Sequence, residues 1–207
     1  MIGIMIFFVL TLLITTVKSH QPFFVEDVLR APIAIPNPIS RSRVWYIDTD
    51  CMTTDSNKPR PPFTLVFNAT AGDKIYFSAG QPTSAIPTKF TADLSLNIKG
   101  GESSSLGPKK SYDSDSQTPT FMYEPYSRTD NIIRLTVDDA VIPTTGEYTL
   151  VVTPSNPLSY FFVTFGTDEG GEDTSSLNLV ELLLRTLPKI TEFYKKSACE
   201  TPVPVAA

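Results

Sequence analysis

Histidine is scarce in this sequence: His20 is the only one among 207 residues. A serine or cysteine nucleophile needs an imidazole beside it inside the fold, so a lone histidine near the chain start excludes Ser-His-Asp and Cys-His catalysis. Carboxylate chemistry stays open, because any chain with 22 Asp and Glu residues offers pairs of carboxylates. We therefore expect a protein that is not an enzyme, with a carboxylate-based hydrolase as the least favoured alternative.

Cysteine is almost as scarce, since Cys51 and Cys199 are the only two. An even number of cysteines in an oxidising compartment predicts a disulfide bond, here one that ties the C-terminal tail to the N-terminal third. In the chain-entropy model, closing so long a loop stabilises the fold by about 4–5 kcal/mol. Two free thiols, or a disulfide bond to a partner, are the alternatives.

Long apolar runs are also lacking, apart from one at the start of the chain. Residues 1–19 have the length and composition of a signal peptide and are short for a membrane span of about 20 residues. Val17 and Ser19 suit the small-residue positions before a cleavage site, which predicts cleavage between Ser19 and His20. An uncleaved anchor is the alternative. We expect a secreted, extracellular protein with no membrane span in the mature chain.

Positive charge is in deficit, because 17 Lys and Arg residues stand against 22 Asp and Glu residues, a net charge of −5. Removal of Lys18 with the signal peptide makes the charge one unit more negative. Nucleic acid requires a basic face, so it is not an expected partner. An extracellular glycan or protein is expected instead, and composition leaves the oligomeric state open.

Proline and alternating hydrophobicity divide the rest of the chain. Residues 20–40 predict an extended lead-in, because they contain Pro22, Pro32, Pro36 and Pro38. Residues 41–166 predict a β-sandwich domain, 167–176 an acidic linker, 177–198 a helical segment and 199–207 a tail. The helical segment has apolar residues at helical spacing, including Ile190, Phe193 and Tyr194 on one face. It is expected to pack on the sandwich or a partner, in preference to a membrane.

Strands are predicted at residues 42–48, 63–68, 74–78, 90–99, 131–137, 146–152 and 160–166, with a short apolar piece at 121–124. The turn at residues 71–73 predicts a hairpin between 63–68 and 74–78, and 146–166 predicts a closing hairpin. Residues 100–119 predict a surface loop. About eight strands without intervening helices predict an all-β fold, an antiparallel jelly-roll-like sandwich with a C-terminal helical appendage.

Two motifs carry a resemblance to a known family. The strand Gly146-Glu147-Tyr148-Thr149-Leu150-Val151-Val152 resembles the late G-x-Y-x-L-x-V strand of pre-peptidase C-terminal-type jelly-roll domains. The strand before Gly72-Asp73 is similar to their early strand. More loosely, the chain resembles uncharacterised extracytoplasmic sandwich proteins that end in a helix. The resemblance implies a secreted β-sandwich and brings no catalytic residues.

Metal ligands are expected only weakly. Calcium prefers several oxygen ligands from acidic loops, and the candidates are Asp113 and Asp115, with further pairs at Asp48/Asp50, Asp138/Asp139 and residues 168–173. The alternative is solvated acidic turns. His20 at a mature N-terminus resembles the copper-binding residue of lytic polysaccharide monooxygenases, but that site needs a second histidine. No other cofactor is expected.

Two further features point to the cell exterior. Asn68-Ala69-Thr70 is a glycosylation sequon at a strand end, so Asn68 is the expected glycan site in a eukaryotic host. Tyr123 and Tyr126, with Trp45 and Tyr46, are candidates for a sugar-stacking platform, although a core role is favoured for Trp45. The sequence thus predicts a non-catalytic module that binds a glycan or protein. A structural or coat component of a matrix or envelope is the alternative.

Overall fold

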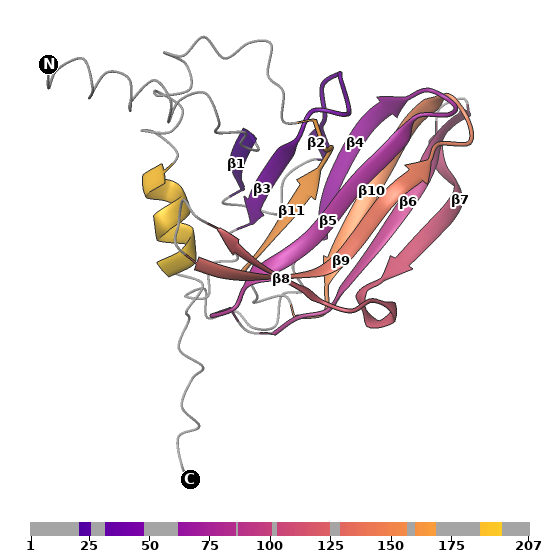
Figure 1. Ribbon diagram of the computed structural model, residues 1–207. Coiled ribbons are helices and arrows are strands. Elements are labelled where there is room, and N and C mark those ends of the chain that lie inside the picture. The colour runs from indigo at the N-terminus through magenta and orange to yellow at the C-terminus, as the bar shows by residue number, and fades with distance from the viewer. Residues whose placement is uncertain are drawn as a thin grey trace, which may run out of the picture.

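In the computed structural model, residues 21–25, 32–47, 62–85, 87–100, 103–124, 129–156, 160–168 and 187–195 are described. Within them, eleven strands form two sheets packed face to face, and one helix spans residues 187–195 (Figure 1). The predicted all-β sandwich is confirmed.

The first sheet has six strands, in the order β1 (Gln21–Val25), β3 (Arg43–Ile47), β11 (Phe161–Phe165), β5 (Lys74–Pro82), β9 (Thr129–Val141) and β8 (Thr120–Glu124). The second has five, in the order β2 (Ile33–Ala34), β4 (Phe63–Ala69), β10 (Gly146–Pro154), β6 (Phe90–Gly100) and β7 (Ser103–Asp113). The sheets are mixed, because β1 pairs with β3, and β2 with β4, in parallel. The expected count of about eight strands omitted β1, β2 and β7.

Strands β4 and β10 bury the face that their alternation predicts. Phe63, Leu65 and Phe67 of β4 point into the space between the sheets, as do Tyr148 and Leu150 of β10. Glu147 and Thr149 lie on the opposite face of β10, where Asn97 donates a hydrogen bond to Glu147 (2.9 Å). Removal of these large apolar side chains from water is the main force that holds the two sheets together.

The two predicted hairpins are wrong. β4 and β5 lie in different sheets, and so do β10 and β11. The chain therefore passes from one sheet to the other between β4 and β5, and again between β10 and β11. The turn at Thr70–Asp73 has the expected chemistry, since Gly72 has φ of +93° and Asp73 N donates to Thr70 O (2.9 Å). A tight turn between two alternating strands can join neighbours in one sheet or strands in opposite sheets. In both arrangements the apolar faces of the two strands point toward the same core.

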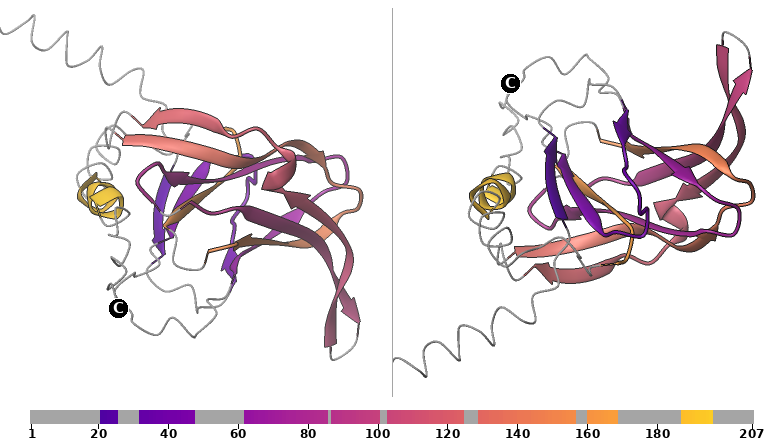
Figure 2. Two further views of the ribbon diagram at one scale, coloured as in Figure 1. Left: turned by 90° about the horizontal axis from the view of Figure 1, so that it is seen from below. Right: turned by 90° about the horizontal axis from the view of Figure 1, so that it is seen from above.

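The predicted surface loop at residues 100–119 is also wrong. Most of it forms β7, which pairs antiparallel with β6, followed by a short 3-10 helix at Ser114–Ser116. Ser, Lys and Pro are tolerated because β7 is an edge strand, with one side of its backbone unpaired and open to polar surroundings. The end of the β6–β7 hairpin projects beyond the rest of the sandwich (Figure 2).

A second apolar cluster lies on the outer face of the six-stranded sheet. Strands β3 and β11 are buried on both faces, because Val44, Tyr46 and Phe162 point away from the first core. Ile190, Phe193 and Tyr194 of the helix cover them, as the shared helix face predicted, and the helix stands beside this sheet in Figures 1 and 2. The helix therefore packs on the sandwich. Residues 177–186 and 196–198 of the predicted helical segment lie outside the described residues.

The described parts of the predicted lead-in contain two strands, β1 and β2, each paired with a strand of the sandwich. β1 lies beside β3 so that Phe23 stacks on Trp45 with ring centroids 5.5 Å apart, and Phe24 stacks on Tyr46 at 5.4 Å. Arg43 is buried next to this strand, and its guanidinium donates to the carbonyl oxygens of Pro36 (2.9 Å) and Arg41 (3.1 Å). The proline-rich segment thus supplies acceptors for a charge that could not otherwise be buried without a large penalty.

Candidate functional site

The most exposed apolar surface in the described part of the chain is strand β8. Its three central residues are Phe121, Met122 and Tyr123, with 73%, 40% and 57% of their surfaces exposed. β8 pairs only with β9, so the other side of its backbone has no strand partner in the described structure (Figure 1). An unpaired strand edge with exposed apolar side chains is a template for another extended chain.

The other three sheet edges differ from β8. The edge strand β2 has two residues, β1 contains Pro22, and β7 carries Lys109 and Lys110. Short length, proline and lysine are the features by which proteins keep strand edges from pairing with other chains. β8 has five residues and contains neither proline nor lysine. The unprotected edge and the exposed apolar side chains therefore coincide on one strand.

The geometry of β8 places its aromatic rings on one face. Successive side chains of a strand alternate, so Phe121 and Tyr123 share a face and Met122 lies on the other. Across the ladder, Phe121 is opposite Ile132 and Tyr123 is opposite Asp130 of β9. Asn131, opposite Met122, is buried, and neither atom of its amide has a hydrogen-bond partner.

The predicted aromatic platform is only partly present. Tyr123 is exposed as a platform requires, but Tyr126 lies outside the described residues. Trp45 and Tyr46 are buried, Trp45 in the core between the sheets, which confirms the core role favoured for it. Sequence reasoning missed Phe121 and Met122 as surface residues. Their signal was a short apolar run between a polar stretch and Pro125, which by itself does not distinguish a buried strand from an exposed one.

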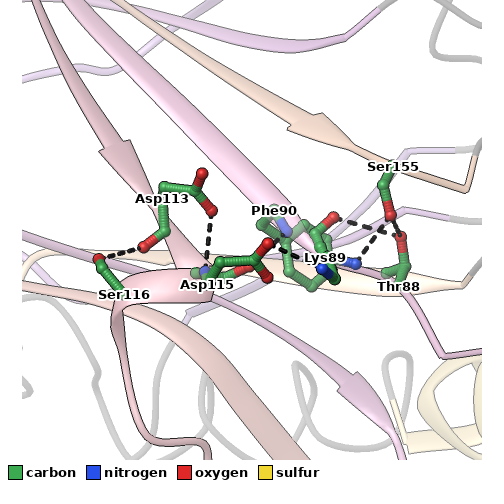
Figure 3. A network of polar contacts seen from close by, with 8 residues as sticks. Thr88, Lys89, Phe90, Asp113, Asp115, Ser116 and Ser155 are labelled. Atoms are coloured by element: carbon green, nitrogen blue, oxygen red, sulfur yellow. Dashed lines mark hydrogen bonds and ion pairs between the residues drawn. The ribbon is translucent and has the colours of Figure 1, made fainter.

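The calcium candidates Asp113 and Asp115 belong to a polar network at one end of the sandwich (Figure 3). Asp113 Oδ1 accepts a hydrogen bond from Asp115 N (2.8 Å), which caps the 3-10 helix. The ammonium of Lys89 lies 2.7 Å from Asp115 Oδ2, and this hydrogen bond and charge raise the pKa of Lys89. Both carboxylates thus have partners within the protein, and a lysine is the cation beside Asp115.

The same network joins three segments of the chain. Ser155 Oγ accepts from Lys89 N (2.9 Å), and Ser114 Oγ accepts from Phe90 N (2.9 Å). The ends of β6, β7 and β10 are therefore tied together by side chains from each, as Figure 3 shows for the labelled residues. These contacts hold the ends of the three strands together.

The remaining candidates are placed as follows. Asn68 is exposed near the end of β4, on the polar face predicted for it, and it is opposite Glu147 in the ladder. Asp139 pairs with Lys74 (3.1 Å), and Asp138 is exposed. The backbone oxygen of Asp168 accepts a hydrogen bond from Ser42 N, and its backbone N–H donates one to Ser40 O. Outside the described residues lie the remaining candidates, His20, Asp48, Asp50, Cys51, residues 169–173 and Cys199.

Two further features are absent from the described residues. No group of three or more His, Cys, Asp and Glu side chains in those segments is arranged to hold a metal ion. None of the helices in the same segments has the length and apolar character needed to cross a membrane.

No protein-family model matches the chain, and no curated protein matches it.

Proposed function

We propose that this chain is a secreted, non-catalytic binding module whose ligand is a protein segment in extended conformation, bound along the edge of β8. The observation that carries the proposal is the coincidence of an unprotected strand edge with three consecutive exposed apolar side chains. An extended peptide would add a strand to the six-stranded sheet. Backbone hydrogen bonds would contribute affinity, and alternate side chains would contribute specificity.

A protein ligand is favoured over a glycan by the arrangement of the apolar side chains. A sugar stacks on aromatic rings that share one face, and only Phe121 and Tyr123 do so here. Met122 is exposed on the opposite face. A partner strand that lies along the edge has side chains on both faces and would contact Met122 as well as the two rings. Glycan recognition through Tyr123 is the alternative outcome of the test below.

The secreted state is part of the same proposal. It is supported by the composition of residues 1–19 and by the exposure of Asn68, which leaves room for a glycan on the outer face of the five-stranded sheet. The Cys51–Cys199 disulfide bond also belongs to it. Mass spectrometry of the secreted protein with and without reduction measures the cleavage site, the disulfide bond and the mass of any glycan together.

The role of a structural or coat component is less well supported. That role would use the C-terminal helix for assembly, whereas the apolar face of helix 187–195 already packs on Tyr46 and Phe162. Assembly through that face would require the helix to leave the sheet. A carboxylate hydrolase has no supporting observation among the described residues.

The test is selection of ligands by the secreted protein from a display library of short random peptides, in parallel with a glycan array. We expect selected peptides to bind and to protect the backbone amides of residues 120–124 from hydrogen exchange. The double variant F121S/Y123S should weaken peptide binding by more than about tenfold, the loss typical of central anchors. V141S is the matched control, because Val141 is also an exposed apolar residue of this sheet, near the far end of β9.

Three results would overturn the proposal. Peptide binding that survives F121S/Y123S would place the ligand elsewhere. Binding of glycans alone, lost on Y123S, would assign the surface to sugars. Self-association of the protein without peptide, abolished by F121S/Y123S in sedimentation experiments, would assign the edge to a second copy of the chain.

A further inference from the structure

The face of β8 that carries Phe121 and Tyr123 continues onto β9. Residues opposite each other in an antiparallel ladder lie on the same face, so Ile132 lies beside Phe121 and Asp130 beside Tyr123. Ile132 is half-buried and Asp130 is exposed. The surface therefore contains an apolar pair and, next to it, an aromatic ring beside a carboxylate.

The carboxylate of Asp130 differs from those of the three aspartates that form ion pairs in the described residues. Asp93, Asp115 and Asp139 each pair with a lysine, at 3.1, 2.7 and 3.1 Å respectively. Asp130 has no ion pair or side-chain hydrogen bond within the described structure, and its backbone oxygen accepts from Thr83 N (2.9 Å). Its charge is therefore free to meet a cation from outside the chain.

A basic side chain, Arg134 of β9, lies beyond Ile132 on this surface of β8 and β9. Arg134 Nε donates a hydrogen bond to Gln81 Oε1 (3.3 Å), and Gln81 is opposite Ile132 in the ladder between β5 and β9. The guanidinium of Arg134 is thus near the Phe121–Ile132 pair, whereas the carboxylate of Asp130 is next to Tyr123. A ligand strand would meet negative charge near Tyr123 and positive charge beyond Phe121.

A strand added beside β8 would lie about 5 Å from it and so about 10 Å from β9. A lysine or arginine opposite Tyr123 is long enough to cross the tyrosine ring and approach Asp130. Along that path the cation would interact with the face of the ring and then with the carboxylate. Antiparallel pairing is the more stable arrangement, and it places the next side chain on this face opposite Phe121.

On the basis of the proposed function, we propose that the β8 edge selects extended peptides with a basic residue two positions before an apolar residue. The basic side chain would lie over Tyr123 toward Asp130, and the apolar one against Phe121 and Ile132. The acidic balance of the whole chain, with a net charge of −5, would add long-range attraction for such a ligand.

The experiment uses two synthetic peptides of identical composition in a threonine-rich host sequence, one with Lys-Thr-Phe and one with Phe-Thr-Lys at its centre. Titrations of the full secreted protein, followed by tyrosine fluorescence and amide chemical shifts, give the two dissociation constants. We expect the Lys-Thr-Phe peptide to bind about two- to fivefold more tightly, the range for an exposed cation over an aromatic ring. Added salt should reduce the preference.

Asp130→Asn should abolish the preference, while Asp138→Asn, an exposed carboxylate farther along β9, should leave it intact. Equal binding of both peptides, with shifts still confined to β8 and β9, would overturn the charge selection and leave the edge as the binding site. A preference that survives Asp130→Asn would also overturn it. Binding of neither peptide would count against the proposed function itself.

Discussion

The phenol oxygen of Tyr148 donates a hydrogen bond to the carbonyl oxygen of Thr144, four residues earlier, at 2.7 Å. Tyr148 is a buried core residue of β10, and this bond satisfies its hydroxyl at the turn that starts the strand. Tyr112 of β7 also packs against the core, edge to face with Phe77, but its hydroxyl is buried without a partner. One buried tyrosine hydroxyl therefore has a hydrogen-bond partner, and the other has none.

Removing the two hydroxyl groups should change stability in opposite directions. Tyr148→Phe should lower the free energy of unfolding by about 1 kcal/mol, because a made hydrogen bond is lost. Tyr112→Phe should be neutral or raise it by up to about 1 kcal/mol, since an unpaired polar group leaves the interior. Urea denaturation of both variants measures the difference. Equal losses in the two would contradict the assignment of their hydroxyl environments.

Gly166 should not tolerate a side chain. It has φ of +80°, and a Cβ atom there would meet the carbonyl oxygen of Arg41 and lie 2.7 Å from that of Ser40. Gly166→Ala should therefore cost about 2–4 kcal/mol, which exceeds the cost of positive φ alone. Gly72→Ala is the control, because Gly72 also has positive φ but open space around it, and its cost should be about 1–2 kcal/mol. Thermal denaturation of the pair tests the ranking.

Phe193 should be the main anchor of the C-terminal helix. Its ring packs edge to face on Tyr46, with centroids 5.0 Å apart, and on Tyr160 at 5.5 Å. Phe193→Ala should destabilise the fold by about 3–5 kcal/mol if the helix and sandwich unfold together. Exposure of the second cluster should also increase binding of a hydrophobic dye. Lys195→Ala, at an exposed position of the same helix, should have little effect. An unchanged urea midpoint in Phe193→Ala would mean that the helix contributes nothing to stability.

Asp93 should make stability depend on acid pH. Partial burial alone would raise the pKa of its carboxyl, but hydrogen bonds from Ser111 (2.7 Å) and Lys109 (3.1 Å), with the lysine charge, hold the pKa below its ordinary value. The resulting stabilisation is complete above the ordinary aspartate pKa of about 3.9 and is lost as the pH falls through the lower, folded-state value.

Ser111→Ala should move the pKa of Asp93 upward, which carboxyl carbon NMR titration measures directly. Asp93→Asn should flatten the acid limb of a plot of unfolding free energy against pH. A titration of Asp93 that is unchanged by Ser111→Ala would show that the serine hydroxyl is not what lowers this pKa.

The strands were predictable where their hydrophobic alternation is local, as in β4, β6 and β10. Their partners were not, because the turns after Ala69 and Pro154 do not say whether the chain stays in its sheet or crosses the core. β7 was missed for a related reason: at an edge, backbone pairing to β6 suffices, and its polar composition resembles a loop. The helix face of Ile190, Phe193 and Tyr194 was predictable, while its partner surface on β3 and β11 required the three-dimensional structure.

The candidate site was predictable only in part. Tyr123 was among the predicted residues, but its neighbours Phe121 and Asp130 come together through strand pairing and the absence of a covering sheet, which are long-range properties. For Asp113 and Asp115, the sequence identified the residues but not their contacts. Their spacing is compatible with a metal site, and only the position of Lys89, brought from another strand, shows how the carboxylates are used.

The positions of β10 and β11 have a consequence for the order in which the molecule can be completed. β10 lies between β4 and β6, and β11 lies between β3 and β5, although both follow all the other strands that the structure describes. The ribosome synthesises the chain from its N-terminus. Strands β3, β4, β5 and β6 are therefore made before residues 146–165, which form the strands that pair with them. Pairings this distant in sequence make folding slow, on the order of milliseconds to seconds. The nascent chain should therefore spend its synthesis with open sheet centres, and protection by a chaperone would matter most just before β11 is released.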